Sequence, residues 1–385
     1  MSSTSTFTST LTSNPLILTR PPPLHPTWKS HIPNLPLPIP TSFPTPHLLK
    51  ATYRQNCASQ TALLLHPSSP LHHLTQHLHL THSFIPSSSP TGHQIPTRLY
   101  TPTHLSHPST PLIIYFHGGG LLVGDLDSED LTCRALSLSL STPLLSIAYR
   151  LLPEFTADDA VSDALSSYSH LCAQFPNRKF TLVGSSSGGQ LAATVALTHL
   201  QAGRISVVVL RCPVTCDATD GGTSIPEEWK NIHKSMSEEF YTGILNKAAV
   251  TKENRVREYR MPLEMLAEMP KLEEASEIEE VKTKWFIQLC TNDIYYSDGV
   301  CLGLGLKERG CDVKMRVEVG WPHTFWLKGM VLEEAQRAEK KLIKGAQWVL
   351  CGLDNAEEPG IKEIGVQGAS DWVEWSEEVK LWPVS

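Results

Sequence analysis

The first third of this sequence lacks acidic residues. Asp125 is the first carboxylate in a chain of 385 residues that has 39 Asp and Glu, 32 Lys and Arg, and a formal net charge of −7. The Lys and Arg residues are not gathered into a basic stripe, so the chain lacks the electrostatic signature of a phosphate-binding surface. We therefore expect no nucleic acid among the partners of this protein.

Long apolar runs and closely spaced cysteine pairs are missing as well. No stretch reaches the roughly 18 apolar residues of a membrane span, and the N-terminus lacks the compact apolar core of a secretion signal. The nine Cys have no CxxC spacing and several stand in apolar runs, which is typical of buried thiols in a reducing compartment. Cys212 and Cys216 flank Pro-Val-Thr, but no second Cys/His pair at zinc spacing accompanies them. We expect a cytoplasmic protein without a metal site.

Histidine and proline are concentrated where acids are absent, because the first 124 residues hold 13 of the 17 His and 19 of the 29 Pro. Ser, Thr and Pro dominate residues 1–46, which predicts a flexible arm. An acid-poor, Ser-rich start is also typical of a mitochondrial transit peptide, but Arg20 is its only Arg and no amphipathic helix is legible. Several His between His66 and His82 alternate with Leu, which indicates a half-exposed strand rather than a metal site.

Strand and helix patterns alternate from Ile95 onward. The apolar runs typical of strands lie at 95–100, 111–116, 143–149, 179–183, 205–210, 284–290 and 313–319. Helical patterns separate most of them, and such alternation predicts an α/β fold with a mostly parallel central sheet and helices on both faces. The strand rhythm stops between 215 and 281, where a helical sequence rich in Met, Glu and Lys predicts a lid over the strand ends.

The C-terminal residues 351–385 form an acidic tail. The tail has eight acids, two Lys, and Trp372, Trp375 and Trp382, whose spacing suits one face of a helix. We expect this face to pack on the protein's own surface. The chain therefore divides into an arm at 1–46, a main domain at 47–350 and the tail.

A Gly-x-Ser-x-Gly motif supplies a candidate nucleophile. The motif Gly184-Ser-Ser-Ser-Gly188 stands between the strand-like run Phe180 to Val183 and a helix-like run that begins at Gln190. This strand-turn-helix context is what the motif requires, because the central Ser sits on a strained turn and only glycine lets neighbouring backbone pass so close. We predict that Ser186 is the nucleophile of an acyl transfer.

A glycine run supplies the matching oxyanion hole. His117-Gly-Gly-Gly directly follows the apolar run at 111–116, and a tetrahedral oxyanion needs backbone N–H donors that no side chain obstructs. We predict that Gly118 and Gly119 give two such donors and that Ser187, which follows the nucleophile, gives the third. A phosphate loop is the alternative, but no Gly-Lys-Ser/Thr follows the run.

A serine hydroxyl needs a His to accept its proton, and in this motif order the His lies downstream. Only three His follow Ser186 in the sequence. His199 lies in the helix that the motif begins, and His233 lies in the lid. His323 follows the last strand pattern, in Gly-Trp-Pro-His-Thr-Phe, and is the predicted base by elimination.

The carboxylate that orients this His should lie between the nucleophile and the base. Asp293 ends the apolar run at 284–290 and therefore lies at the carboxyl end of a strand, where side chains of parallel sheets converge. Asp298 is the competing candidate, although its position favours membership of the helix that runs to Arg309. We predict Asp293 as the acid.

These motifs resemble the hormone-sensitive-lipase-like branch of the α/β-hydrolase superfamily, from about Ile95 to Leu350. Four of them carry the resemblance in order: His117-Gly-Gly-Gly, Tyr149-Arg-Leu-Leu-Pro-Glu154, Gly184-Ser-Ser-Ser-Gly-Gly189, and Asp293 with Gly-Trp-Pro-His323-Thr-Phe. The resemblance implies an α/β-hydrolase fold, a cap made by the N-terminal segment and the insertion 215–281, and no cofactor. It also implies structural roles for Arg150 and Glu154, expected to pair near the active-site floor, and for Asp163.

Three positions depart from the family pattern. Ser185 replaces the usual Asp, which alters the hydrogen bonds beneath the nucleophile. Ile294 and Tyr295 replace the usual Pro-Leu after the catalytic Asp. Thr324 replaces the Gly after His323 and is expected to narrow the space beside the base.

The leading hypothesis is a carboxylic ester hydrolase that acts on a small hydrophobic or acetylated ester through a Ser acyl-enzyme. The biased, Pro-rich termini resemble those of fungal small-molecule esterases of secondary metabolism. One alternative uses the same site as a lyase, cyclase or acyl transferase, and another is a catalytically dead receptor. Aromatic and Met residues of the lid are expected to line an apolar pocket: Trp229, Phe240, Tyr241, Tyr259, Met261, Met265 and Met269. The sequence leaves the oligomeric state open.

Overall fold

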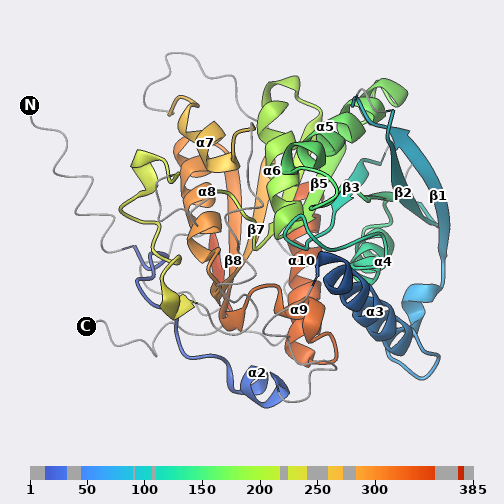
Figure 1. The fold of residues 1–385 in the computed structure, drawn as a ribbon, viewed down its shortest axis with the longest axis horizontal. Coiled ribbons are helices and arrows are strands. Elements are labelled where there is room, and N and C mark those ends of the chain that lie inside the picture. Colours follow the sequence, from blue (N-terminus) through green and yellow to red (C-terminus); the bar gives the residue numbers. More distant parts are fainter. Residues whose placement is uncertain are drawn as a thin grey trace, which may run out of the picture.

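A single sheet organises the chain (Figure 1). The computed structural model describes residues 14–32, 45–89, 92–105, 110–216, 224–240, 259–271, 283–351 and 372–376. Within these ranges the sheet has nine strands in the order β1-β2-β4-β3-β5-β6-β7-β8-β9. The β1/β2 and β2/β4 pairs are antiparallel, and the other pairs are parallel. The predicted α/β fold with a mostly parallel sheet is thereby confirmed.

The strands are β1 (Leu78–Pro86), β2 (Gln94–Pro102), β3 (Leu112–Phe116), β4 (Leu144–Ile147), β5 (Phe180–Ser185), β6 (Ile205–Arg211), β7 (Lys284–Asn292), β8 (Asp312–Pro322) and β9 (Val373–Trp375). The α-helices are α2 (Pro26–His31), α3 (Pro46–Leu64), α4 (Asp130–Ser139), α5 (Ala157–Gln174), α6 (Ser187–Thr198), α7 (Pro262–Ala267), α8 (Tyr296–Glu308), α9 (Phe325–Lys328) and α10 (Glu333–Cys351). Each of the seven apolar runs that predicted strands coincides with one of β2 to β8.

Helices cover both faces of the sheet because the strand side chains alternate between two cores. In β3, Leu112, Ile114 and Phe116 join the core that packs under α5, α6 and α8. Ile113 and Tyr115 point the other way, into a core shared with α4 and α10. No helix in the described ranges combines the length and apolar character needed to cross a membrane.

The N-terminal arm differs from the flexible segment that composition predicts. Residues 14–32 contact the body, with Leu16, Leu18 and Trp28 buried and the short helix α2 formed. Apolar residues scattered among Pro and Ser therefore find partners on the body, which composition alone does not reveal. Residues 1–13 and 33–44 lie outside the described ranges.

The tail also takes a different form from its prediction. Residues Val373–Trp375 form β9, a strand that pairs in parallel with β8, whereas the Trp spacing predicted a helix face. Glu374 accepts hydrogen bonds from Arg316 (2.5 Å) and Lys341 (2.7 Å), which fixes the strand to the body. Trp382 lies outside the described ranges.

Arg150 forms the central buried ion pair of the fold, but its partner is not the predicted one. Its guanidinium donates to both carboxylate oxygens of Asp163 (2.9 and 2.8 Å) and also pairs with Asp159. Glu154 instead binds Lys50 of α3 and is well exposed. The predicted Arg150–Glu154 pair is therefore wrong, because the bend of the chain after residue 150 turns Glu154 toward α3.

Asp163→Ala is expected to lower the free energy of unfolding by about 3–5 kcal/mol, since it leaves the buried Arg150 guanidinium without its main counter-charge. Urea denaturation measures this change. Glu154→Ala is the matched control, and removal of its exposed ion pair should cost about 1 kcal/mol or less. Equal losses in the two variants would contradict the assignment of Arg150 to Asp163.

Candidate active site

Ser186 occupies a strained turn between β5 and α6. Its backbone has φ 54° and ψ −119°, a conformation that costs a non-glycine residue on the order of 1–3 kcal/mol. The turn closes only because glycines flank it. A Cβ atom on Gly184 would lie 2.1 Å from the Gly188 carbonyl oxygen, and one on Gly188 would lie 2.0 Å from the Phe116 carbonyl oxygen. The motif therefore has the physical form that its sequence predicts.

His323 and Asp293 complete a hydrogen-bonded chain with Ser186. His323 Nε2 lies 2.8 Å from Ser186 Oγ, and His323 Nδ1 lies 2.7 Å from Asp293 Oδ2. The second carboxylate oxygen of Asp293 accepts the Tyr295 N–H at 2.9 Å. The three predicted residues thus meet at the carboxyl ends of β5 (Ser186), β7 (Asp293) and β8 (His323). The hydrogen bonds join them in the order Ser186, His323, Asp293, which is the order that a nucleophile, a base and an orienting acid require.

Burial and the acid act on His323 in opposite directions. Burial disfavours the charged imidazolium, but the attraction and hydrogen bond of Asp293 raise the pKa of His323 above its usual 6.5. The imidazolium that would form after proton transfer from Ser186 is therefore stabilised by its neighbour.

Asp298 and His233, the competing candidates for the acid and the base, belong to a separate cluster. Asp298 Oδ1 lies 2.9 Å from His233 Nε2, and the Cys216 Sγ atom lies 3.3 Å from the same nitrogen. Asp298 also accepts the backbone N–H groups of Thr215 and Cys216. This fully buried cluster fastens the first described part of the insertion to α8 and takes no part in the chain from Ser186.

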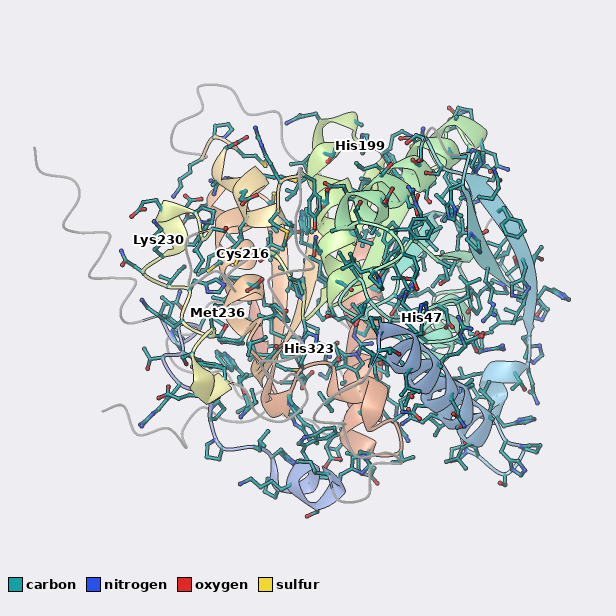
Figure 2. All side chains as sticks on the ribbon, viewed as in Figure 1. His47, His199, Cys216, Lys230, Met236 and His323 are labelled. Atoms are coloured by element: carbon teal, nitrogen blue, oxygen red, sulfur yellow. The ribbon has the colours of Figure 1, made fainter. Side chains whose placement is uncertain are left out.

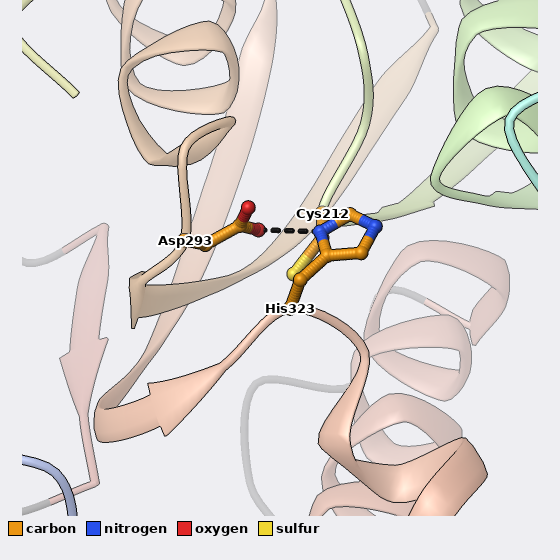
Figure 3. Close-up of side chains that lie close together, drawn as sticks. All are labelled: Cys212, Asp293 and His323. Atoms are coloured by element: carbon orange, nitrogen blue, oxygen red, sulfur yellow. Dashed lines mark hydrogen bonds and ion pairs between the residues drawn. The ribbon is translucent and has the colours of Figure 1, made fainter. Parts of the chain in front are cut away.

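Cys212 and Cys216, which flank Pro-Val-Thr in the sequence, face different clusters. Cys212 lies beside Asp293 and His323, with the ligand-type atoms of the three within 4.8 Å of one another (Figure 3). Figure 2 shows Cys216 well away from His323. In each cluster the histidine and the aspartate are joined by a direct hydrogen bond. Neither cluster therefore requires an ion to hold its side chains together.

His199, the remaining downstream histidine, lies at the far end of α6. It caps the C-terminus of this helix, and Figure 2 shows it near the upper edge of the molecule, whereas His323 lies near the middle of the view. Of the three histidines downstream of Ser186, only His323 reaches the nucleophile.

The glycine run lies against the nucleophile, but its first N–H is already occupied. A Cβ atom on Gly118 would lie 3.4 Å from the Ser186 Cβ atom. The Gly118 N–H, however, donates to Glu129 Oε1 at 2.6 Å, and the other oxygen of this buried carboxylate accepts the Tyr115 hydroxyl. The predicted oxyanion role of Gly118 is therefore not available in this conformation.

Three other N–H groups of the glycine loop and the turn have no acceptor among the described residues. Gly119, Gly120 and Ser187 donate no backbone or side-chain hydrogen bond within the part of the chain that the structure describes. Ser187 opens α6, whose first N–H groups have no acceptor within the helix. Its hydroxyl accepts the Leu121 N–H at 3.2 Å, which ties the glycine loop to the turn. The sequence did not predict the contact of Glu129 with the Gly118 N–H, because only the folded loop shows which glycine N–H the carboxylate binds.

Two departures from the family pattern have visible consequences. The Ser185 hydroxyl is fully buried and has no hydrogen-bond partner among the described residues. Thr324, directly after the base, adopts a left-handed conformation (φ 48°, ψ 38°) that is costly for a β-branched residue. A glycine at this position would avoid that cost.

Within the described part of the insertion, the residues predicted to line an apolar pocket divide between the core and a hollow that does not include Ser186. Trp229, Phe240 and Met261 are buried in the core, and Gly305 of α8 allows the Trp229 ring to pack against it. Tyr259, Met265 and Met269 line a hollow of about 340 Å³ between α5, α6 and α7, and its lining includes neither Ser186 nor His323. Gln190, one turn from the nucleophile, donates to the Tyr259 hydroxyl at 2.7 Å. Tyr241 lies outside the described ranges.

Comparison with known proteins identifies a family and several relatives. A family model described as alpha/beta hydrolase fold matches residues 113–327. A versiconal hemiacetal acetate esterase of Emericella nidulans is 38% identical over 124 residues, which are 31% of this chain and 43% of that protein. An ethyl acetate hydrolase of Pseudomonas putida is 27% identical over 270 residues, 66% of this chain and 79% of the hydrolase. The match therefore spans less than half of the Emericella nidulans protein.

Solved structures share the fold. Vibralactone cyclase superposes with a TM-score of 0.70 at 24% identity, over 86% of this chain and 96% of the cyclase. A Pyrobaculum calidifontis esterase superposes with a TM-score of 0.63 at 20% identity, over 86% of this chain and 100% of the esterase. Likeness at these identities establishes the architecture.

Replacement of the acid should change how His323 titrates. In Asp293→Asn the attractive carboxylate is lost while the burial remains, so the imidazole pKa is expected to fall below its wild-type value. NMR of the ring nitrogens and protons across pH measures this shift. Asp298→Asn is the control, because Asp298 bonds to His233 and should leave the His323 titration unchanged. An unchanged titration in Asp293→Asn would refute the pairing.

Thr324→Gly is expected to raise the free energy of unfolding by about 0.5–1 kcal/mol. Glycine removes the strain of the left-handed backbone, and the gain is reduced by the greater freedom of glycine in the unfolded chain. Thermal or urea unfolding measures the change. A loss of stability would mean that the Thr324 side chain makes compensating contacts.

Proposed function

Because the chain belongs to the α/β-hydrolase-fold family, we propose that it is a serine esterase in which Ser186, His323 and Asp293 form the catalytic triad. The observation that carries the proposal is the pair of hydrogen bonds of 2.8 and 2.7 Å that joins Ser186 Oγ, both His323 nitrogens and Asp293. Without such a base, a serine hydroxyl is a poor nucleophile.

In the proposed reaction, Ser186 Oγ attacks the acyl carbon of an ester while His323 Nε2 accepts the hydroxyl proton. Asp293 holds the imidazole in the required tautomer and stabilises the imidazolium. Collapse of the tetrahedral intermediate breaks the bond to the alkoxy oxygen, which His323 protonates as the alcohol leaves. Water, deprotonated by His323, then attacks the acyl-enzyme. Collapse of the second tetrahedral intermediate releases the acid as His323 returns the proton to Ser186 Oγ.

The oxyanion of each tetrahedral intermediate is assigned to the N–H groups of Gly119, Gly120 and Ser187. Each is without an acceptor among the described residues, and preorganised donors of this kind contribute about 3–4 kcal/mol each to transition-state stabilisation. Glu129 supports them indirectly by holding Gly118, the first residue of the loop.

Small acetate esters are the favoured substrate class. The names of two similar proteins, a versiconal hemiacetal acetate esterase and an ethyl acetate hydrolase, both denote acetyl groups. The likeness to the former also supports a role in secondary metabolism. Ser186 is 8% exposed and Ile294 and Tyr295 beside the acid are buried, so an acyl group at the nucleophile lies among apolar neighbours and is suited to be small.

Ser186→Ala is expected to lower kcat/KM for a short-chain aryl acetate by about 10⁴-fold or more, because the nucleophile is removed while the fold is kept. Initial-rate assays measure the loss. The matched control is Ser185→Ala, which deletes a neighbouring hydroxyl that has no hydrogen-bond partner among the described residues and should retain most of the activity.

A fluorophosphonate should label the wild-type protein at one residue per chain and should not label Ser186→Ala. Near-wild-type turnover by Ser186→Ala would sink the triad. Stoichiometric labelling together with negligible ester turnover would point to a lyase, cyclase or acyl transferase, and absence of labelling would point to a receptor. Product analysis by mass spectrometry then distinguishes lyase, cyclase and acyl-transferase activity from one another.

A further inference from the structure

The N-terminal arm crosses the ends of the two strands that carry the acid and the base. Asn292, which precedes Asp293, donates from Nδ2 to the Pro22 carbonyl oxygen at 2.7 Å. Three residues further along the arm, the His25 N–H donates to the carbonyl oxygen of Gly320, at 2.8 Å, just upstream of His323. One short stretch of arm backbone therefore binds both the chain that leads into Asp293 and the chain that leads into His323, here called the acid loop and the base loop.

Aromatic packing fixes the arm on the base loop. The rings of His25 and Trp321 stack with centroids 4.6 Å apart, and Trp28 meets Trp321 and Phe325 edge-on. Trp321 and Phe325 flank His323 in sequence and stack on each other at 4.2 Å. Figure 1 shows α2, which contains Trp28, beside α9 at the lower edge of the molecule.

The arm backbone lies so close to the body at position 320 that this position requires glycine. Gly320 has a positive φ of 78°, and a Cβ atom there would lie 3.0 Å from both the His25 nitrogen and the Pro23 carbonyl oxygen. The Gly320 N–H donates to Thr291 Oγ1 at 2.8 Å, and the Thr291 hydroxyl donates to Asn292 Oδ1 at 3.0 Å. Thr291 thus joins the acid and base loops from within, while the arm joins them from outside.

We propose that residues 22–28 are a positioning element, here called the arm clamp, that sets the separation of Asp293 and His323. The proposal rests on the proposed function, since it requires this pair to serve Ser186. The clamp makes no hydrogen bond to Ser186 among the described residues, and it acts through the two loops that it binds. A displacement of about 1 Å between catalytic groups can lower turnover about 100-fold.

The test compares Trp28→Ala, Asn292→Ala and Trp28→Phe in the full chain. For an aryl acetate, the two alanine variants are expected to lower kcat about 10- to 100-fold and to change KM less than about 2-fold, because geometry rather than binding is disturbed. Trp28→Phe keeps an edge-on ring and should recover most of kcat. If Trp28→Ala does not fold, Asn292→Ala still removes one hydrogen bond to the arm.

A second readout does not depend on turnover. The low-field proton between His323 Nδ1 and Asp293 should shift or broaden in both alanine variants, as observed by NMR, and remain in place in the control. The control is Trp348→Ala, which truncates a tryptophan of α10 that lies against the Lys284 and Lys314 ammonium groups, away from both loops.

Wild-type kcat and an unshifted proton in folded Trp28→Ala and Asn292→Ala would overturn the arm clamp. An equal loss in Trp348→Ala would also overturn it, because general destabilisation would then explain the effect. Failure of the proposed function has a different signature, namely an active Ser186→Ala enzyme. The His323 proton still reports on the clamp in that case.

Discussion

The positive φ of Ser186 is the constraint from which the rest of the site follows. A serine cannot keep this backbone conformation unless its surroundings hold it from several sides. The Ser186 N–H donates to the Arg211 carbonyl at the end of β6, and its own carbonyl accepts N–H groups from Val214 and from Gln190 of α6. The strained residue is thus pinned between the next strand and the helix that it begins. The hydroxyl is carried out of the sheet edge as a result.

Parallel pairing brings the other groups to this same edge. The strands β5, β6, β7 and β8 run in one direction, so their carboxyl ends lie together and the residues that follow them are neighbours although far apart in sequence. Asp293 and His323 each follow the end of their strand within two residues. The register also pairs Asn292 with Pro322, so the acid and base loops start side by side.

Local sequence patterns were sufficient for much of this arrangement. Apolar runs bounded by glycine predicted β3 and β5, and the demand for glycine around a strained serine predicted Ser186. The chain order of motifs then left His323 as the base. Each of these inferences depends on residues within a few positions of one another, or on elimination among a few histidines.

Contacts between distant segments explain what the sequence could not predict. Whether the Gly118 N–H is free depends on where Glu129, the residue before α4, lies. The partner of Arg150 depends on the path of the chain toward α3. The conformation of residues 14–32 depends on pockets formed by residues some 300 positions later in the sequence. The strand β9 has only three residues, which are too few to display the alternation of a strand in the sequence.

The absence of acids before Asp125 has a consequence for how the protein is made. In the described ranges, every ion pair formed by a base from this first third uses an acid from later in the chain: His47 and Lys50 with Glu154, Arg54 with Asp125, and Arg98 with Asp127 and Asp130. During synthesis, α3 and β2 therefore emerge from the ribosome as a purely cationic segment with no counter-charge of its own. The pairs of Arg54 and Arg98 form only after the glycine loop and the start of α4 have followed, and the pair of Lys50 forms only after β4 as well. The order of translation therefore also sets the order in which this part of the molecule becomes electrostatically complete.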